Sequence, residues 1–349
     1  MKKIKVIVVD DSEVYRKVLR DALKGHPEID VVSESHNGRL ALPRIKFHRP
    51  DYIILDVNMP DMGGIETLEN LKEMGSGAKV IMFSSASKES ASITFESLRL
   101  GAIDFISKPN ISNLEKLSSY IETHLIHKIL SLEKSHRKSH EKVKVSQPTV
   151  KKAALTRTFE ICAIGVSTGG PVALQKYFRH IKKDIKGAIL VVQHMPEVFT
   201  KHFAESLDQQ FPLIFHEARD GQKIEKGNVY IAPGGKHFLV TKKNNEYYCK
   251  ITNDEPREFC RPSIDNLFES VAKEAPNKSI AIVMTGMGHD GTMGMQALKE
   301  VNGFTMVQSL DSCLIKSMPS NVMEKVHIDY SGDLVSLADK TNKLLGASF

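Results

Sequence analysis

The chain has 349 residues, of which 41% are hydrophobic and 26% charged, and its formal net charge is +6. This composition is typical of a globular protein of about two domains, and no apolar stretch approaches the roughly 20 residues that cross a bilayer. We therefore expect a cytoplasmic protein without membrane insertion. Its four scattered cysteines, Cys162, Cys249, Cys260 and Cys313, are expected to remain reduced thiols.

The first block, residues 1–127, alternates short apolar runs, which predict strands, with longer runs whose apolar residues are three or four positions apart, which predict helices. The expected strands are 4–9, 29–33, 51–55, 78–83 and 102–106. The expected helices are 13–24, 38–47, 64–74, 89–100 and 112–130. Such a succession of strand–helix units predicts an α/β fold, with a doubly wound parallel sheet covered by helices on both faces.

A basic segment, residues 128–157, follows this block. Between residues 131 and 158 the chain has eight Lys or Arg and two Glu, an excess equal to the net charge of the whole chain. Because the segment is also poor in large apolar residues, we expect a flexible, solvated linker. No aromatic residues are interleaved with these charges, so we expect no nucleic-acid binding.

The second block, residues 158–349, shows the same alternation of strand and helix patterns. The expected strands are 159–164, 187–192, 213–216, 229–232 and 279–284, and the expected helices are 171–181, 197–210, 263–274, 291–300 and 334–345. Residues 236–251 contain two β-rich runs around a polar turn and predict a hairpin. We expect a second doubly wound, Rossmann-like parallel sheet that carries this hairpin.

Chemically reactive side chains follow the strands of the first block. Asp10 and Asp11 follow the first strand, Asp56 the third, Ser84 the fourth and Lys108 the fifth. In a parallel sheet these positions share one edge. Three neighbouring carboxylates need a cation, and oxygen ligands favour Mg²⁺, whereas a lysine supplies a point charge for a phosphoryl group. Taken singly, each feature also fits a helix N-cap or a turn.

The first block resembles a response-regulator receiver domain, flavodoxin-like in fold. The stretches VVDDS, LDVNMP, MFSS and GAIDFISKP stand where that family has its functional motifs. The resemblance implies that Asp56 accepts a phosphoryl group from a histidine kinase of the CheA type. It also implies that Asp10, Asp11 and Asp56 hold Mg²⁺, and that Ser84 and Lys108 sense the phosphoryl group.

The stretch GVSTG, residues 165–169, ends the first strand of the second block. It matches G-x-S-x-G, in which a serine nucleophile lies on a strand-to-helix turn. On this evidence alone, a glycine turn with Ser167 or Thr168 as a helix cap fits equally well. A nucleophilic serine needs a base, and the base needs an orienting carboxylate.

Two other strand ends offer these groups. His194 follows the second strand in VVQHMP, and Asp290 lies in the glycine-rich loop MTGMGHDG. His327, which the chain order of an α/β-hydrolase would require, lies in KVHIDY, which looks like part of a strand. We expect Ser167, His194 and Asp290 to meet at the carboxyl edge of one sheet.

The second block resembles the catalytic domain of the CheB-type chemotaxis methylesterases, and the order receiver, linker, esterase matches that family too. The matching stretches are IGVSTGGP, VVQHMP, YIAPGGKHF, RPSIDNLF and MTGMGHDGTMGMQALK. The resemblance implies hydrolysis of glutamyl γ-methyl esters on methyl-accepting chemoreceptors, with protein-glutamine glutaminase activity as a companion and no cofactor for the esterase reaction. It implies Ser167 as nucleophile, His194 as base, Asp290 as orienting carboxylate and the backbone N–H of Met287 as oxyanion donor.

Several positions depart from the family pattern. Gly63 and Gly235 stand where acidic residues are common, and VQSLDSC replaces the usual Q-D-E segment, so substrate contacts near residues 309–313 are not carried over. His289 is a competing candidate for the base. His289 is adjacent to Asp290, and neighbours on a loop rarely point at the same substrate. We therefore expect His194, and not His289, to act as the base.

The family resemblance also implies that the unphosphorylated receiver covers the active site and that phosphorylation of Asp56 relieves this block. Because the linker is long, we expect weak docking and loose basal inhibition. Other interpretations are a DNA-binding response regulator, which would need a helix-turn-helix after the linker, a catalytically inactive receptor-binding adaptor, and a serine hydrolase of small esters.

Overall fold

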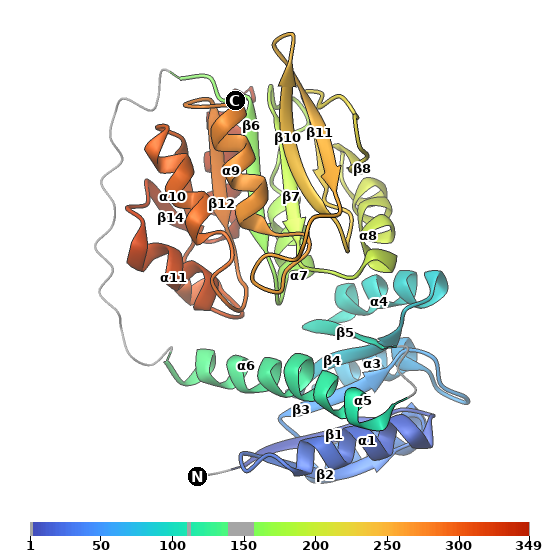
Figure 1. Cartoon of the computed structure of the whole chain (residues 1–349). Coiled ribbons are helices and arrows are strands. Elements are labelled where there is room, and N and C mark those ends of the chain that lie inside the picture. The colour runs from blue at the N-terminus through green and yellow to red at the C-terminus, as the bar shows by residue number, and fades with distance from the viewer. Residues whose placement is uncertain (1–2, 110–112, 139–156, 349) are drawn as a thin grey trace. The chain divides into compact units, whose positions relative to one another are not determined.

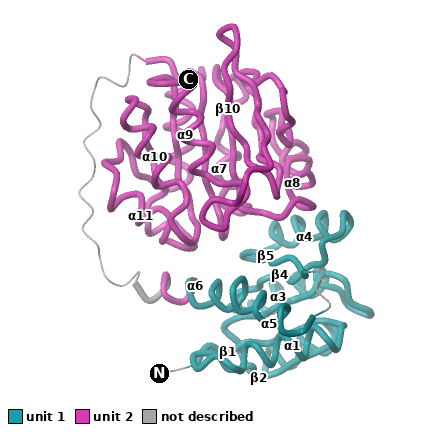
Figure 2. The backbone as a smooth tube through the Cα atoms, viewed as in Figure 1, with its two compact units in different colours: residues 1–131 teal, residues 132–349 magenta. Residues whose placement is uncertain are grey.

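The computed structural model describes residues 3–109, 113–138 and 157–348. They belong to two compact units, Met1–Ser131 and Leu132–Phe349, which Figure 2 shows in different colours. Each unit is described here by itself. Among the described residues, no helix combines the length and the apolar character of a membrane span.

The first unit is built on a five-stranded parallel sheet in the order β2-β1-β3-β4-β5 (Figure 1). Its strands are β1 (Ile4–Val9), β2 (Ile29–Ser35), β3 (Tyr52–Asp56), β4 (Lys79–Ser85) and β5 (Asp104–Lys108). Its helices are α1 (Glu13–Lys24), α2 (Gly38–His48), α3 (Gly64–Glu73), α4 (Lys88–Leu100), α5 (Leu114–Ile121) and the π turn η1 (Glu122–Ile126). The next helix, α6 (His127–Lys138), begins in this unit and extends past its last residue, Ser131. This order is flavodoxin-like, so the expected fold of the first block is confirmed.

Helices on both faces of the sheet explain the apolar runs of its central strands. In β1, Val6, Ile7, Val8 and Val9 are all fully buried, as in a strand that packs on both sides. The chain then turns within three residues, and the Ser12 hydroxyl caps α1. This short connection leaves the two aspartates between strand and helix at the carboxyl edge of the sheet.

The segment that was expected to be a linker begins as helix. α6 continues the chain from α5 through η1 as far as Lys138, so the linker prediction was wrong for residues 128–138, of which 128–130 also belonged to the expected helix 112–130. The reason is an apolar face: Leu125 and Ile129 are fully buried, and Lys128 pairs with Asp104 at 2.6 Å. Residues 139–156 lie outside the described residues, so a flexible linker and the limits 1–127 and 158–349 stay predictions.

The second unit is built on a seven-stranded parallel sheet in the order β14-β13-β12-β6-β7-β9-β8. Its strands are β6 (Ile161–Val166), β7 (Ala188–Gln193), β8 (Ile214–Glu217), β9 (Asn228–Ile231), β12 (Ser279–Val283), β13 (Phe304–Gln308) and β14 (Tyr330–Gly332). Its helices are α7 (Gly170–Phe178), α8 (Glu197–Gln210), α9 (Ile264–Glu274), α10 (Thr292–Glu300), the short η3 (Leu310–Ser312), α11 (Ser317–Lys325) and α12 (Leu334–Leu344).

The predicted hairpin is present as an antiparallel pair, β10 (His237–Lys243) and β11 (Glu246–Thr252). Its turn residues, Asn244 and Asn245, have φ of 50° and 62°, which a two-residue hairpin turn requires and asparagine tolerates. The expected doubly wound sheet with a hairpin is therefore confirmed. Four elements were not predicted, β13, η3, α11 and β14, and His327 lies in the loop before β14 and not in a strand.

The strand order brings three distant parts of the chain together. β6 pairs with β12 on one side and with β7 on the other, and the three lie side by side (Figure 1). The loops that follow them therefore share the carboxyl edge of the sheet. Helix α9 packs against β6, β12 and the hairpin strand β10, which brings its first turn to the same edge.

Candidate active site

Ser167 lies on a short turn between β6 and α7. Gly169 caps α7 with φ of 74°, a conformation that favours glycine. The side-chain amide of Gln193 donates to the carbonyl oxygens of Ser167 at 3.0 Å and His194 at 2.9 Å. A Cβ atom on Gly170 would lie 1.8 Å from Gln193 Oε1, so glycine is required for the amide to hold this turn.

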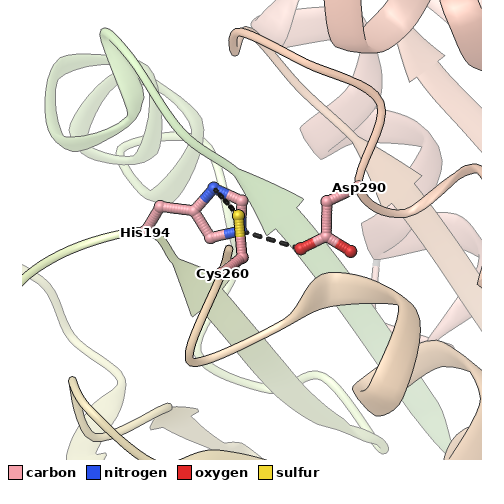
Figure 3. A group of neighbouring side chains, drawn as sticks. All are labelled: His194, Cys260 and Asp290. Atoms are coloured by element: carbon pink, nitrogen blue, oxygen red, sulfur yellow. Dashed lines mark hydrogen bonds and ion pairs between the residues drawn. The ribbon is translucent and has the colours of Figure 1, made fainter. Parts of the chain in front are cut away.

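His194 contacts both other members of the predicted set. Its Nδ1 lies 3.2 Å from Ser167 Oγ, and its Nε2 lies 2.9 Å from Asp290 Oδ2. The structure thus brings together the three residues that sequence reasoning singled out. Hydroxyl, imidazole and carboxylate in this sequence of contacts form the arrangement of a serine hydrolase. In Figure 3 one ring nitrogen of His194 contacts Asp290, and the other contacts the sulfur of Cys260, which lies across the ring.

Asp290 is held by the first turn of α9. It accepts hydrogen bonds from Ser263 Oγ at 3.0 Å and from the backbone N–H groups of Ile264 and Asp265 at 2.7 and 2.9 Å. Burial raises the pKa of this carboxyl, but the hydrogen bonds from His194 and from the helix N-terminus outweigh burial and lower the pKa of Asp290 below its ordinary value. Asp290 is therefore ionised at neutral pH.

The ionised carboxylate decides which ring nitrogen carries the proton. Asp290 can only accept a hydrogen bond, so Nε2 of His194 must donate. In the neutral imidazole, Nδ1 then has a free lone pair facing the Ser167 hydroxyl. Burial lowers the pKa of His194, but the bond to Asp290 outweighs burial and holds the pKa above its ordinary value. His194 is therefore a strengthened base.

Met287 lies in the loop between β12 and α10, close to Ser167. A Cβ atom on the preceding Gly286 would lie 2.9 Å from Ser167 Cβ and 2.2 Å from Met318 Sδ, so the loop backbone passes directly beside the serine. The next residue, Gly288, has φ of 95°. The Met287 backbone is thus adjacent to the nucleophile, and its side chain is partly exposed.

Two residues that sequence reasoning missed fix this loop. Gln308, at the end of β13, accepts the Thr285 N–H at 2.9 Å and donates to the Ser312 carbonyl at 2.8 Å. Thr285 Oγ1 lies 3.1 Å from the Thr168 carbonyl oxygen and accepts the Ile315 N–H at 2.9 Å. The VQSLDSC segment, which departs from the family pattern, thus supports the loop through Gln308. Sequence reasoning noted Gln308 only as part of VQSLDSC and gave it no role, because its strand was not predicted.

The competing base candidate faces a different partner. Nε2 of His289 contacts a carboxylate oxygen of Glu258, and its side chain is 55% exposed. His194 has only 17% of its side chain exposed and contacts the serine and the aspartate. His289 is next to Asp290 in the sequence, but His194 is the histidine that contacts Asp290 in the structure. The geometry therefore favours His194 as the base.

A second cluster of charged residues lies at the carboxyl edge of the first sheet. Lys108 Nζ lies 2.8 Å from Asp10 Oδ2 and 2.7 Å from Asp56 Oδ2, and all three are buried or nearly so. Carboxylate oxygens of Asp10, Asp11 and Asp56 lie within 4.8 Å of one another. This all-oxygen donor set fits a hard divalent cation such as Mg²⁺.

The electrostatics of this cluster agree with a cation site. Burial, followed by the negative charge of Asp10, raises the pKa of Asp56 to about 6 although Lys108 opposes the change. Burial also raises the pKa of Asp10. One lysine thus compensates two buried carboxylates incompletely, and a bound cation would stabilise their ionised forms.

Ser84 is placed differently from the other receiver residues. It is fully buried at the end of β4, where its Oγ accepts a hydrogen bond from Thr94 Oγ1 of α4 at 2.8 Å. The structure brings Asp10, Asp56 and Lys108 together, whereas the Ser84 hydroxyl contacts Ser90 and Thr94 of α4.

Comparisons with known proteins match both units. The family model "CheB methylesterase" matches residues 162–341, and "Response regulator receiver domain" matches residues 6–122. The protein-glutamate methylesterase/protein-glutamine glutaminase of Desulfotalea psychrophila is 37% identical over 94% of this chain and 95% of its own length. Its counterpart in Halalkalibacterium halodurans is 39% identical over 97% of each chain.

A solved structure agrees with the second unit. The CheB methylesterase catalytic domain of Thermotoga maritima is 34% identical and aligns with a TM-score of 0.52, covering 54% of this chain and 100% of that domain. Fold and site define the class: a response regulator whose output domain carries a serine-hydrolase site. The chain belongs to the CheB methylesterase family.

Proposed function

We propose that this chain hydrolyses glutamyl γ-methyl esters on methyl-accepting chemoreceptors, and deamidates glutaminyl side chains, through an acyl-enzyme on Ser167. The observation that carries the proposal is the unbroken set of contacts from Ser167 through His194 to Asp290, at 3.2 and 2.9 Å. The names of the relatives supply the substrate class. The reaction is proposed to take place in the cytoplasm.

In the first half-reaction, Ser167 Oγ attacks the ester carbonyl carbon while His194 Nδ1 takes the hydroxyl proton. The tetrahedral intermediate collapses, the carbon–oxygen bond to the methoxy group breaks, and His194 returns the proton so that methanol leaves. In the second half-reaction, His194 takes a proton from water, which attacks the acyl-enzyme. The products are the glutamate side chain and free Ser167; with glutamine, ammonia leaves in place of methanol.

Two groups stabilise the charges that develop in this reaction. The ionised carboxylate of Asp290 compensates the imidazolium formed on His194. The backbone N–H of Met287, in the loop beside Ser167, donates to the oxyanion of the tetrahedral intermediate. One such donor contributes about 3 kcal/mol of transition-state stabilisation.

The receiver unit regulates this site. A histidine kinase of the CheA type serves as phosphodonor for Asp56, and Asp10, Asp11 and Asp56 hold Mg²⁺, which supplies charge neutralisation for phosphoryl transfer. Lys108, within 2.7 Å of Asp56, pairs with the phosphoryl oxygens. Ser84 turns from Thr94 to the phosphoryl group, since a new acceptor competes for its hydroxyl.

The test is methanol release from a methylated receptor by the wild type, Ser167→Ala and a matched control, Ser206→Ala on α8. Removal of the nucleophile should lower the rate by about 10⁴-fold or more, whereas the control should stay close to the wild type. Methanol release that survives in Ser167→Ala would overturn the proposed nucleophile.

A further inference from the structure

Cys260 lies at the catalytic histidine, and the mechanism gives it no part. Its Sγ is 3.9 Å from His194 Nδ1, the same nitrogen that faces Ser167 Oγ at 3.2 Å. The residue is partly exposed and has a free thiol. In Figure 3 the sulfur lies across the imidazole ring, and a carboxylate oxygen of Asp290 is within 4.8 Å of it.

The backbone around Cys260 is held firmly. Arg257 and Cys260 exchange two backbone hydrogen bonds, at 3.1 and 2.8 Å, around a turn in which Glu258 and Phe259 have φ of 52° and 63°. The Arg257 guanidinium makes a two-pronged contact with Glu269 of α9, at 2.7 and 2.8 Å. The Cys260 backbone is therefore held close to α9, whose first turn also holds the Asp290 carboxylate.

Thiolate and imidazole are preferred ligands of zinc. With Zn–S of about 2.3 Å and Zn–N of about 2.0 Å, two ligand atoms in a tetrahedral site lie about 3.5 Å apart. The 3.9 Å between Cys260 Sγ and His194 Nδ1 is close to this separation, so a cation fits between them after a small movement of one side chain. Ser167 Oγ, 3.2 Å from the same ring nitrogen, offers a third donor atom.

In such a site Asp290 would not bind the metal but would hold the histidine that does. Each of its two oxygens already accepts two hydrogen bonds, from Ser263, Ile264, Asp265 and His194. A carboxylate that accepts the other ring N–H of a histidine ligand fixes the ring and raises its basicity, as in many zinc sites. The catalytic pair is therefore already arranged to strengthen a metal bond at Nδ1.

We propose that a thiophilic divalent cation, Zn²⁺ above all, binds between Cys260 Sγ and His194 Nδ1 and thereby inhibits the enzyme reversibly. On binding, the thiol loses its proton to solvent and the neutral imidazole shares its Nδ1 lone pair with the metal, without any redox change. Nδ1 then cannot accept the Ser167 proton. The metal site rests on geometry, whereas its effect on rate rests on the proposed function.

The binding test uses the full chain with Zn²⁺ in excess Mg²⁺, which occupies the acidic cluster of the receiver unit. Calorimetry should find a zinc site in the wild type and in Cys313→Ser, a matched control whose thiol faces carbonyl oxygens. Cys260→Ser should bind Zn²⁺ more than about 100-fold more weakly than the wild type. This loss is larger than the loss expected for a residue that only contacts a metal ligand. Co²⁺ should give thiolate-to-metal charge-transfer absorption in all but Cys260→Ser. Equal affinities, or absorption that persists in Cys260→Ser, would overturn the site.

The activity test measures methanol release with and without Zn²⁺, each variant relative to its own rate in chelator. Zinc should inhibit the wild type and Cys313→Ser, a chelator should restore both, and Cys260→Ser should resist the same concentration. Zinc binding at Cys260 without loss of rate would refute inhibition. A chain that releases no methanol under any condition would refute the proposed function, while calorimetry would still decide the metal site.

Discussion

The proposed chemistry of the second unit depends on the negative charge of Asp290 and on the proton that the neighbouring His194 imidazole carries. Asp290 is ionised because a helix N-terminus and His194 compensate its burial, and its charge in turn raises the pKa of His194. The base is therefore strong, but it must lose its proton before it can act. Activity should consequently rise with pH as the raised pKa of His194 is passed.

Removing the carboxylate charge tests this coupling. In Asp290→Asn the pKa of His194 should fall, because burial still lowers it while the compensating charge is gone. The acidic limb of the pH profile of kcat/KM should move to lower pH. The maximal rate should fall by about 10³- to 10⁴-fold, because the tautomer is no longer fixed.

The control for that profile is Asp208→Asn on α8, whose carboxylate accepts the Phe215 N–H at 2.8 Å. It should leave the acidic limb where it is in the wild type. A limb that stays fixed in Asp290→Asn, or that moves to higher pH, would show that Asp290 does not set the protonation of His194.

At the scale of the elements, strands β6, β7 and β12 carry the reacting groups, and β13 supports them from outside. Gln308 at the end of β13 is buried and accepts the Thr285 N–H at the base of the catalytic loop. In Gln308→Ala this N–H would be left buried without its partner. We expect the free energy of unfolding of the catalytic unit to fall by about 1–3 kcal/mol.

The loop should also shift, so kcat should fall more than KM changes. Denaturant unfolding, followed for the transition of the catalytic unit, and steady-state methanol release measure the two effects. Gln296→Ala on α10 is the matched control, since its amide contacts only Glu300 on the helix surface. If the two variants were equally stable and equally active, the support assigned to Gln308 would be wrong.

Elements with strong periodicity were predictable, and short or weakly patterned ones were not. Buried parallel strands such as β1 and β6 are predictable because their sequences are continuous apolar runs. β14 has three half-exposed residues, too few for a pattern. α6 was predicted only as far as residue 130, because many charges follow in its sequence.

That Ser167, His194 and Asp290 lie together could be predicted, because strand ends in a parallel sheet share an edge. Their supporting contacts could not, because these depend on loop paths that sequence patterns do not encode. Ser263 reaches Asp290 across 27 positions, and Gln308 reaches Thr285 across 23. The position of the Cys260 thiol likewise depends on the tight turn that Arg257 anchors to α9.

At the scale of the whole molecule, the two units use one architecture for two chemistries. Each is a parallel sheet whose active groups lie beyond the carboxyl ends of its strands. In the first unit the groups are carboxylates around Lys108, and in the second they are Ser167, His194 and Asp290. Regulation then requires that phosphorylation of Asp56 changes the rate at Ser167.

The regulatory proposal predicts a difference between the full chain and the fragment 155–349. The unphosphorylated full chain should release methanol more slowly than the fragment, and phosphorylation should bring its rate toward that of the fragment. One phosphoryl group biases such an equilibrium by a few kcal/mol at most. Equal rates for the fragment and for both forms of the full chain would reject gating.

The central claim is that Ser167 becomes covalently acylated, and trapping the intermediate tests it most directly. A methylated receptor fragment is mixed with the enzyme, the reaction is quenched with acid within one turnover, and peptide mass spectrometry locates the adduct. We predict a glutamyl ester on Ser167, lost in Ser167→Ala. An adduct on Cys260, or complete hydrolysis through a quench series without any adduct, would contradict the account.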